Sequence, residues 1–147
     1  DYDDLIEAVA PVVTEEWGHF RMVMKELKSR NLRLGPQRKD EYVNALIRFQ
    51  KKGGGRKQHL LEKLLMAALI EARSCERFRL LSEGLEDVGL KKFYHEFMIS
   101  EAGHYTMFIE LANQYCGKEM VKKRWQEWLD EEAKIMAALE LKGERMH

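Results

Sequence analysis

Two Glu-x-x-His pairs stand out among the residues whose types and spacing could do chemistry. One pair is Glu16 with His19, and the other is Glu101 with His104. Residues three apart on a helix lie on the same side, so a carboxylate and an imidazole at this spacing can bind one metal ion. Each pair is therefore a candidate metal-binding motif.

Each pair interrupts a stripe, at helical spacings of three and four residues, that is otherwise apolar or aromatic. The first stripe consists of Leu5, Val9, Val12, Glu16, His19, Val23 and Leu27. The second consists of Tyr94, Phe97, Glu101, His104, Phe108, Leu111 and Tyr115. Burying an unpaired carboxylate in such a stripe is strongly unfavourable. Two such pairs, with one Glu from each of two further helices, form the di-iron or di-manganese site of ferritin-like bundles. The alternative is that each pair is a buried Glu–His salt bridge without a metal.

A third helix should then supply a lone Glu, and the sequence offers Glu71 and Glu76. Helical periodicity does not separate them, but height along the helix does. The chain folds back near residues 86–87, so Glu101 and Glu71 lie at equal distances from the turn, whereas Glu76 is displaced by about five residues, or ~7 Å. We therefore expect Glu71 to be the ligand. Glu76 should bind the free ring nitrogen of a metal-bound histidine or pair with an Arg, or else serve as an alternative ligand.

A complete site of this type needs a sixth ligand, a Glu on a helix that precedes Glu16. Glu7 does not qualify, because its position on the same helix places it about 13 Å away along the axis. The first residue is Asp1 and not Met. We therefore expect the sixth ligand on a preceding bundle helix that is missing from this chain.

The elements that must position these residues are all helices, because helical periodicity dominates the sequence. We expect five helices, over residues 3–30, 39–50, 58–83, 89–115 and 118–141. Residues 51–57, Lys-Lys-Gly-Gly-Gly-Arg-Lys, should form a flexible basic loop, because three consecutive glycines disfavour helix. A short turn at residues 84–88 makes the third and fourth helices antiparallel neighbours. The expected fold class is an all-α, ferritin-like antiparallel bundle, a single N-terminally incomplete domain over residues 1–147 with its last helix packed across the outside.

The composition excludes disordered, fibrous and membrane-spanning classes. The chain has 147 residues, of which 45% are hydrophobic and 34% are charged. It contains neither a run of 18 apolar residues nor a signal peptide, so we expect a cytoplasmic protein without a membrane partner. The two cysteines, Cys75 and Cys116, are expected to be buried thiols in a reducing compartment.

Three segments resemble the MiaE-type tRNA hydroxylase family. They are Ala-Leu-Ile-Glu-Ala-Arg-Ser-Cys-Glu-Arg-Phe at residues 68–78, Phe-Tyr-His-Glu with Ser-Glu-Ala-Gly-His-Tyr between residues 93 and 105, and Thr-Glu-Glu-Trp-Gly-His-Phe at residues 14–20. The resemblance covers nearly the whole chain. It implies a non-haem di-iron monooxygenase that uses O₂ and two electrons from an external donor. The implied substrate is the isopentenyl group of 2-methylthio-N6-isopentenyladenosine, beside the anticodon of tRNA.

The resemblance also implies the ligands of two iron ions, namely Glu16, His19, Glu71, Glu101 and His104. Ligation by carboxylates and imidazoles suits iron or manganese independently of the family, and zinc is a possible substitute. The missing leading helix is the departure from the family pattern.

A net charge of zero conceals a basic segment. Ten Lys and Arg but only two Asp and Glu lie between residues 28 and 59. Clusters of Lys and Arg bind RNA phosphates, so we expect Lys51, Lys52, Arg56 and Lys57 to contact tRNA. The alternative is an ordinary solvated surface.

Two other functional classes fit the same motifs. Another ferritin-like protein, for iron storage or with peroxidase or manganese catalase activity, needs a metal centre but no RNA-binding surface. A metal-free helical interaction module would retain the Glu-x-x-His pairs only as salt bridges. Affinity for tRNA and metal content separate these classes from a tRNA hydroxylase.

Overall fold

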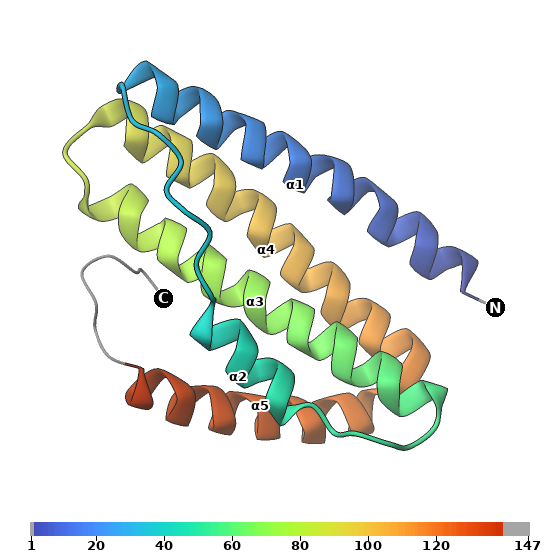
Figure 1. Cartoon of the computed structure of the whole chain (residues 1–147). Helices are drawn as coiled ribbons and strands as arrows, with labels where there is room; N and C mark the ends of the chain where they lie inside the picture. The colour runs from blue at the N-terminus through green and yellow to red at the C-terminus, as the bar shows by residue number, and fades with distance from the viewer. Residues whose placement is uncertain (1, 140–147) are drawn as a thin grey trace. The chain divides into compact units, whose positions relative to one another are not determined.

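The computed structural model describes residues 2–139, and every regular element in that range is an α-helix (Figure 1). The helices are α1 (Asp3–Ser29), α2 (Glu41–Phe49), α3 (Arg56–Gly84), α4 (Val88–Cys116) and α5 (Lys118–Ala138). This confirms the all-α expectation. The expected end of the last helix at residue 141 lies outside the described residues. The chain divides into two compact units, Asp1–Lys39 and Asp40–His147.

The first unit consists of α1 and the segment that follows it. Pro11 lies inside the helix without ending it. Asn31 adopts a left-handed conformation with φ 56°, and the Leu32 amide donates to the Leu27 carbonyl at 2.8 Å. This pattern satisfies carbonyls at the end of a helix that otherwise have no partner. The chain therefore leaves α1 in a defined direction.

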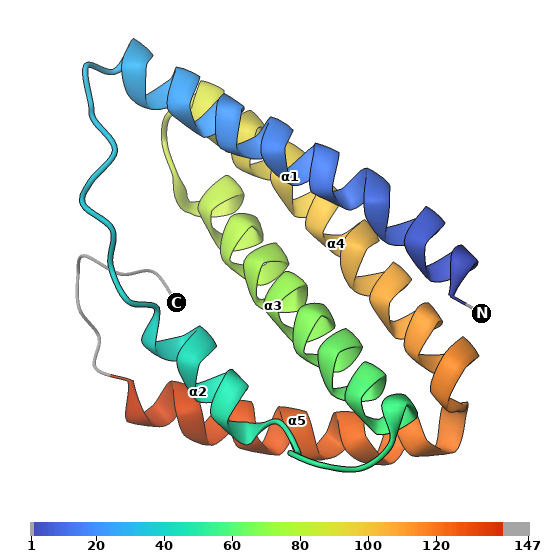
Figure 2. The same cartoon turned by 45° about the vertical axis from the view of Figure 1, so that its right-hand side comes forward.

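The second unit is built on the antiparallel hairpin of α3 and α4, which share the most extensive contact in the unit (Figure 2). Only residues 85–87 connect the two helices. Asp87 begins α4, because its side chain accepts a hydrogen bond from the Leu90 amide at 3.0 Å. The short connection keeps residues at equal distances from the turn beside each other.

Helices α2 and α5 contact each other and both contact α3, and α5 also contacts α4. Asp40 caps α2 by accepting from the Val43 amide at 3.0 Å. The buried apolar side chains of the second unit come from all four of its helices: Tyr42, Leu46, Leu61, Leu64, Leu65, Ala68, Leu69, Phe97, Phe108, Leu111, Ala112, Cys116, Val121 and Trp128. The last helix therefore packs against the hairpin, as expected.

Helix α5 buries two charged side chains. They belong to a row of three buried residues spaced four apart, Arg124, Trp128 and Glu132. Trp128 is fully buried, and Arg124 and Glu132 lie one turn on either side of it. Arg124 pairs with Glu62 of α3, and Glu132 pairs with Arg73 of α3. These two ion pairs join α5 to α3 on either side of Trp128.

Helix α3 begins at Arg56, two residues earlier than its sequence predicts. The His59 amide donates to the Gly55 carbonyl at 3.2 Å, so the helical hydrogen-bond ladder starts directly after the three glycines. Arg56 and Lys57 therefore lie in the first turn of a helix and not in a flexible loop.

None of the helices within residues 2–139 combines the length and the apolar character needed to cross a membrane.

Candidate metal centre

Three potential metal ligands converge between α3 and α4. Glu71 of α3 and Glu101 and His104 of α4 each offer a ligand atom, and these atoms all lie within 4.8 Å of one another. Oε2 of Glu71 is 3.7 Å from Nδ1 of His104. Glu101 and His104 are buried, and the Glu71 side chain is 15% exposed to solvent. The cluster is compact enough to surround a cation.

The local sequence explains how this cluster forms. Glu101 and His104 are three residues apart on α4, so both project from one side of that helix. Because α3 and α4 form a tight antiparallel hairpin, Glu71 lies at the same height. Glu76 is not in the cluster. It is exposed, and its Oε1 atom lies 3.9 Å from Nη2 of Arg79.

The second Glu-x-x-His pair lies on α1, in the other unit. Oε1 of Glu16 is 3.3 Å from Nδ1 of His19. A carboxylate and an imidazole one helical turn apart are thus already close enough to bind one ion together. The spacing repeats the arrangement of Glu101 and His104 on α4.

The donor set of the α3–α4 cluster fits iron or manganese. It consists of two carboxylates and one imidazole, which are oxygen and nitrogen ligands typical of these metals in oxygen-handling sites. Two buried or nearly buried carboxylates beside each other repel, and a divalent cation between them removes that repulsion.

Close to Glu71 in sequence, a buried hydrogen-bond network of Tyr42, Arg73 and Glu132 connects three helices of the second unit. Oε1 of Glu132 accepts hydrogen bonds from Arg73 at 2.6 and 2.8 Å and from the Tyr42 hydroxyl at 3.1 Å. Burial, followed by the nearby charge of Glu132, raises the pKa of Tyr42. Arg73 is two residues from Glu71, so this group restrains the part of α3 that carries the ligand.

A cysteine lies beside the cluster. Cys75 is one helical turn after Glu71 and is half-buried. Burial and then the charge of Glu101 raise the pKa of its thiol, which keeps it protonated. Cys116 is buried, and its thiol lies 3.6 Å from the Lys57 carbonyl. The expectation of a buried thiol is therefore confirmed for Cys116 and wrong for Cys75, which is only half-buried.

Aromatic rings fill the space between the cluster and the α3–α4 turn. The Phe78 ring stacks on Tyr94 with centroids 5.8 Å apart and meets Phe97 edge-on at 5.4 Å. Phe93 lies 4.5 Å from Phe97. Because Phe97 is one turn before Glu101, this aromatic group forms an apolar wall next to the candidate ligands.

The four basic residues expected to contact RNA surround the start of α3. Lys51 and Lys52 precede the glycines, and Arg56 and Lys57 follow them. All four side chains are on the surface. Lys51 differs from the others because its Nζ atom lies 2.8 Å from Glu127 of α5.

The buried charges Glu62, Arg124 and Glu132 were not predicted from the sequence. Each looks like an ordinary charge on an amphipathic helix, since its partner lies on a different helix. The available signal was the spacing of Arg124, Trp128 and Glu132, which places two charges on the face of the most buried tryptophan.

The fold and the cluster together define a ferritin-like helical protein with a carboxylate- and histidine-lined centre. A protein described as "Protein 43 with aldehyde deformylating oxygenase activity" from Synechococcus has a similar structure, with a TM-score of 0.87 and 33% sequence identity. The match covers 94% of this chain and 68% of that one.

More particularly, the chain belongs to the MiaE family, described as tRNA-(MS[2]IO[6]A)-hydroxylase, whose model matches residues 1–147. A tRNA 2-(methylsulfanyl)-N(6)-isopentenyladenosine(37) hydroxylase of Pseudomonas putida is 37% identical over 112 residues, which are 76% of this chain and 53% of that protein. The protein of the same name from Salmonella typhimurium is 31% identical over 116 residues, which are 79% of this chain and 42% of that protein. The chain thus spans about half the length of these curated relatives.

Proposed function

We propose that the protein is an O₂-dependent tRNA hydroxylase that acts on the isopentenyl group of 2-methylthio-N6-isopentenyladenosine near the anticodon. The observation that carries this proposal is the convergence of Glu71, Glu101 and His104 within 4.8 Å, in a chain that belongs to the MiaE family. The curated relatives carry the same activity in their names. The proposed partner is tRNA and the proposed location is the cytoplasm.

The proposed cofactor is a pair of iron ions, held by Glu16, His19, Glu71, Glu101 and His104. The α1 pair supports this set because Glu16 and His19 repeat the spacing of the α4 pair and lie 3.3 Å apart. When bound, the iron pair supplies the reduction of O₂ that hydroxylation of an aliphatic C–H bond requires. An external donor provides the electrons. Manganese and zinc bind the same donor types and are the expected substitutes.

The chain's own residues restrain the site and place apolar surface beside it. The hydrogen bonds of Arg73 to Glu132 at 2.6 and 2.8 Å restrain α3 next to Glu71. The aromatic wall of Phe78, Tyr94 and Phe97 suits a branched apolar group such as isopentenyl, because it offers apolar surface and excludes water close to the ligands.

The test is a reconstituted reaction. Protein purified under anaerobic conditions and loaded with Fe(II) is mixed with hypomodified tRNA, a chemical reductant and then O₂. The nucleosides of the digested tRNA are separated and weighed by mass spectrometry. We expect a product that is one oxygen atom heavier than the isopentenylated nucleoside, and no product from zinc-loaded protein. Iron-loaded protein that yields no product under these conditions contradicts the proposal.

A second candidate activity is the oxygen-dependent deformylation of an aldehyde. It is favoured by the structural neighbour from Synechococcus, which carries that activity in its name and is 33% identical to this chain. The same iron-loaded protein, reductant and O₂ are supplied with a long-chain aldehyde in place of tRNA. Formate release without tRNA hydroxylation supports this alternative. Iron uptake without either product indicates a storage or peroxidase-type protein, and a failure to bind iron indicates a metal-free module.

A further inference from the structure

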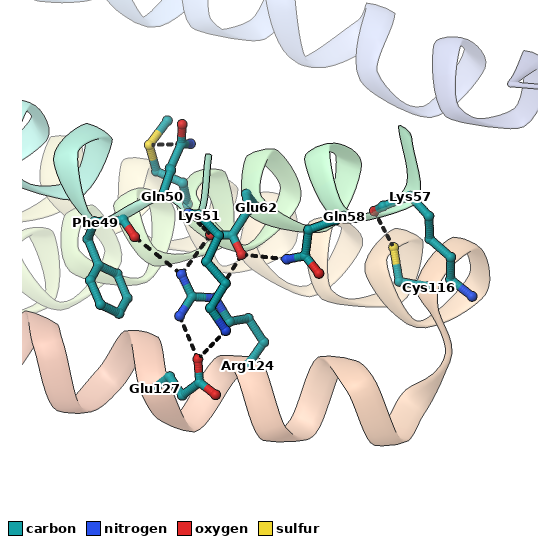
Figure 3. A network of polar contacts seen from close by, with 10 residues as sticks. Phe49, Gln50, Lys51, Lys57, Gln58, Glu62, Cys116, Arg124 and Glu127 are labelled. Atoms are coloured by element: carbon teal, nitrogen blue, oxygen red, sulfur yellow. Dashed lines mark hydrogen bonds and ion pairs between the residues drawn. The ribbon is translucent and has the colours of Figure 1, made fainter. Parts of the chain in front are cut away.

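The buried carboxylate of Glu62 bonds to both ends of the glycine loop, residues 50–55 between α2 and α3 (Figure 3). Glu62 is only 2% exposed. Its Oε2 atom accepts a hydrogen bond from the Lys51 amide at 3.3 Å, and its Oε1 atom accepts one from Gln58 Nε2 at 2.8 Å. Lys51 precedes the three glycines and Gln58 follows them. The two ends of the loop therefore cannot separate without breaking a bond to Glu62.

Arg124 of α5 holds this carboxylate in place (Figure 3). Its Nε and Nη2 atoms each lie 2.8 Å from an oxygen of Glu62, which is the two-point geometry that orients a carboxylate. Nη2 also donates to the Phe49 carbonyl at 3.3 Å, and the guanidinium lies 4.5 Å from the centre of the Phe49 ring. The anchor of the loop is thus connected to the end of α2 as well.

The glycines make the anchored loop tight. Gly53 and Gly54 adopt left-handed conformations with φ of 88° and 86°, which favour glycine. A Cβ atom at position 54 would lie 3.1 Å from the Gln58 side chain. The loop therefore passes close to the residue that bonds to Glu62, and its shape is coupled to the buried network.

Lys51 belongs to this network. Its Nζ atom lies 2.8 Å from Oε2 of Glu127, which also accepts from Arg124 Nη1 at 2.6 Å. The hydrogen bonds from Lys51 and then Arg124 lower the pKa of Glu127, so this carboxylate stays ionised. The charge of Lys51 is thus already matched within the protein.

The three other cations on either side of the glycines differ from Lys51. Lys52, Arg56 and Lys57 have exposed side chains, and within the described part of the chain no carboxylate lies within ion-pair distance of any of them. The first turn of α3 contains no acidic residue. Three unmatched positive charges therefore flank a short loop whose base is rigidly held.

We infer that Lys52, Arg56 and Lys57 form a surface that binds the phosphate backbone of RNA, and that the Glu62–Arg124 pair positions this surface. Lys51 is a structural residue of the network and not a phosphate contact. The surface therefore has three of the four basic residues expected from the sequence. The choice of RNA as the partner rests on the proposed function. A pre-shaped group of unmatched cations suits phosphates, because little conformational freedom is lost on binding and each phosphate contact releases counterions.

The first test measures the salt dependence of RNA binding. The probe is an anticodon stem–loop RNA, titrated with the purified protein at several KCl concentrations. Replacing Lys52, Arg56 and Lys57 together with Gln should reduce the slope of log K against log salt by roughly 2 to 3 units, since each lost contact removes about 0.7 to 0.9. Lys51→Gln should leave the slope unchanged. Lys92→Gln, at the other end of the α3–α4 hairpin, is the matched single-charge control.

The second test separates positioning from charge. Glu62→Gln keeps the shape of the side chain but removes the charge that orients Arg124 and the loop. We expect RNA affinity to fall several-fold with an unchanged salt slope, because the same three cations still reach phosphates. A role in stability alone would lower the melting temperature and leave the affinity of the folded protein as it is. If circular dichroism shows that this variant does not fold, Gln58→Ala, which removes one anchor, replaces it.

The outcomes distinguish this inference from the proposed function. Wild-type binding with an unchanged slope in the triple variant overturns the inference and leaves the hydroxylase proposal standing. A fall in slope of about 0.7 to 0.9 in Lys51→Gln, the value of one phosphate contact, means that Lys51 also contacts RNA and overturns its separation from the other three cations. Wild-type protein that binds iron but no RNA at any salt concentration overturns both.

Discussion

Glu71 and His104 come from different helices, yet Oε2 of the one lies 3.7 Å from Nδ1 of the other. This distance joins α3 to α4 at the level of Glu101. It follows from the short connection at residues 85–87, which places side chains at equal distances from the turn next to each other. The two side chains are within ion-pair distance of each other, and both are candidate metal ligands.

The choice between the two glutamates of α3 leads to the first prediction. Glu71→Gln should lower iron affinity by more than about tenfold. Loss of a residue that only hydrogen-bonds to a ligand already lowers metal affinity by about that much, and loss of a ligand itself should cost more. Glu76→Gln should leave iron binding unchanged, since Glu76 is exposed and lies near Arg79. Iron per protein is measured by mass spectrometry after equilibration with a competing chelator. Retained iron in Glu71→Gln together with lost iron in Glu76→Gln would show that the wrong glutamate was assigned.

The second prediction concerns the histidine of the α3–α4 cluster. His104→Ala removes a nitrogen ligand and leaves Glu101 buried beside a weakened site, so both iron content and the stabilisation that iron provides should fall. His95→Ala, an exposed histidine on the same helix, is the control and should change neither. Mass spectrometry measures the iron content of each variant, and thermal unfolding with and without Fe(II) measures the stabilisation that iron provides. Equal iron content in the two variants would favour the salt-bridge interpretation of the motif.

The sequence was enough to predict that Glu101, His104 and Glu71 lie close together, because this depends only on local geometry. The spacing of Glu101 and His104 is a property of a single helix, and the height of Glu71 depends only on residue counts on either side of one turn. Helix ends marked by a capping side chain, as at Asp40 and Asp87, were placed to within one or two residues.

The buried ion pairs could not be predicted in the same way. Glu62 and Arg124 pair across helices that are distant in sequence, and the identity of a partner depends on how α5 crosses α3. Periodicity gives the face of a helix and not its neighbour. The start of α3 at Arg56 was missed for a related reason, because glycine is a poor helix former but an acceptable residue at a helix start.

The third prediction tests these buried ion pairs by unfolding in urea. Arg124→Met should destabilise the protein by about 3 to 5 kcal/mol, because it leaves the Glu62 carboxylate buried without its partner. Replacing both residues with Met should recover most of that loss. Arg79→Met breaks an exposed pair with Glu83 and serves as the control, with an expected loss below about 1 kcal/mol. A double variant as unstable as the single one would mean that the geometry of the pair itself is essential.

The last prediction concerns alkaline pH. Burial and then the charge of Glu132 raise the pKa of Tyr42, so the folded protein keeps this phenol neutral where an unfolded chain ionises it, above about pH 10. The contribution of Tyr42 is therefore complete below pH 10 and is lost as the pH rises above it. The wild type should lose about 1.4 kcal/mol per pH unit more than Tyr42→Phe in that range.

Urea unfolding at several pH values between 8 and 11, followed by circular dichroism, measures the effect. Near neutral pH, Tyr42→Phe should cost about 1.5 to 3 kcal/mol, because it removes a hydrogen bond of 3.1 Å to a charged group. Tyr105→Phe is the control, since that ring is only half-buried and lies 6.1 Å from Trp125. Parallel stability curves for the wild type and Tyr42→Phe above pH 10 would mean that the phenol ionises in the folded state as easily as in the unfolded chain. The hydrogen bond from Tyr42 to Glu132 would then not favour the neutral phenol in the folded protein.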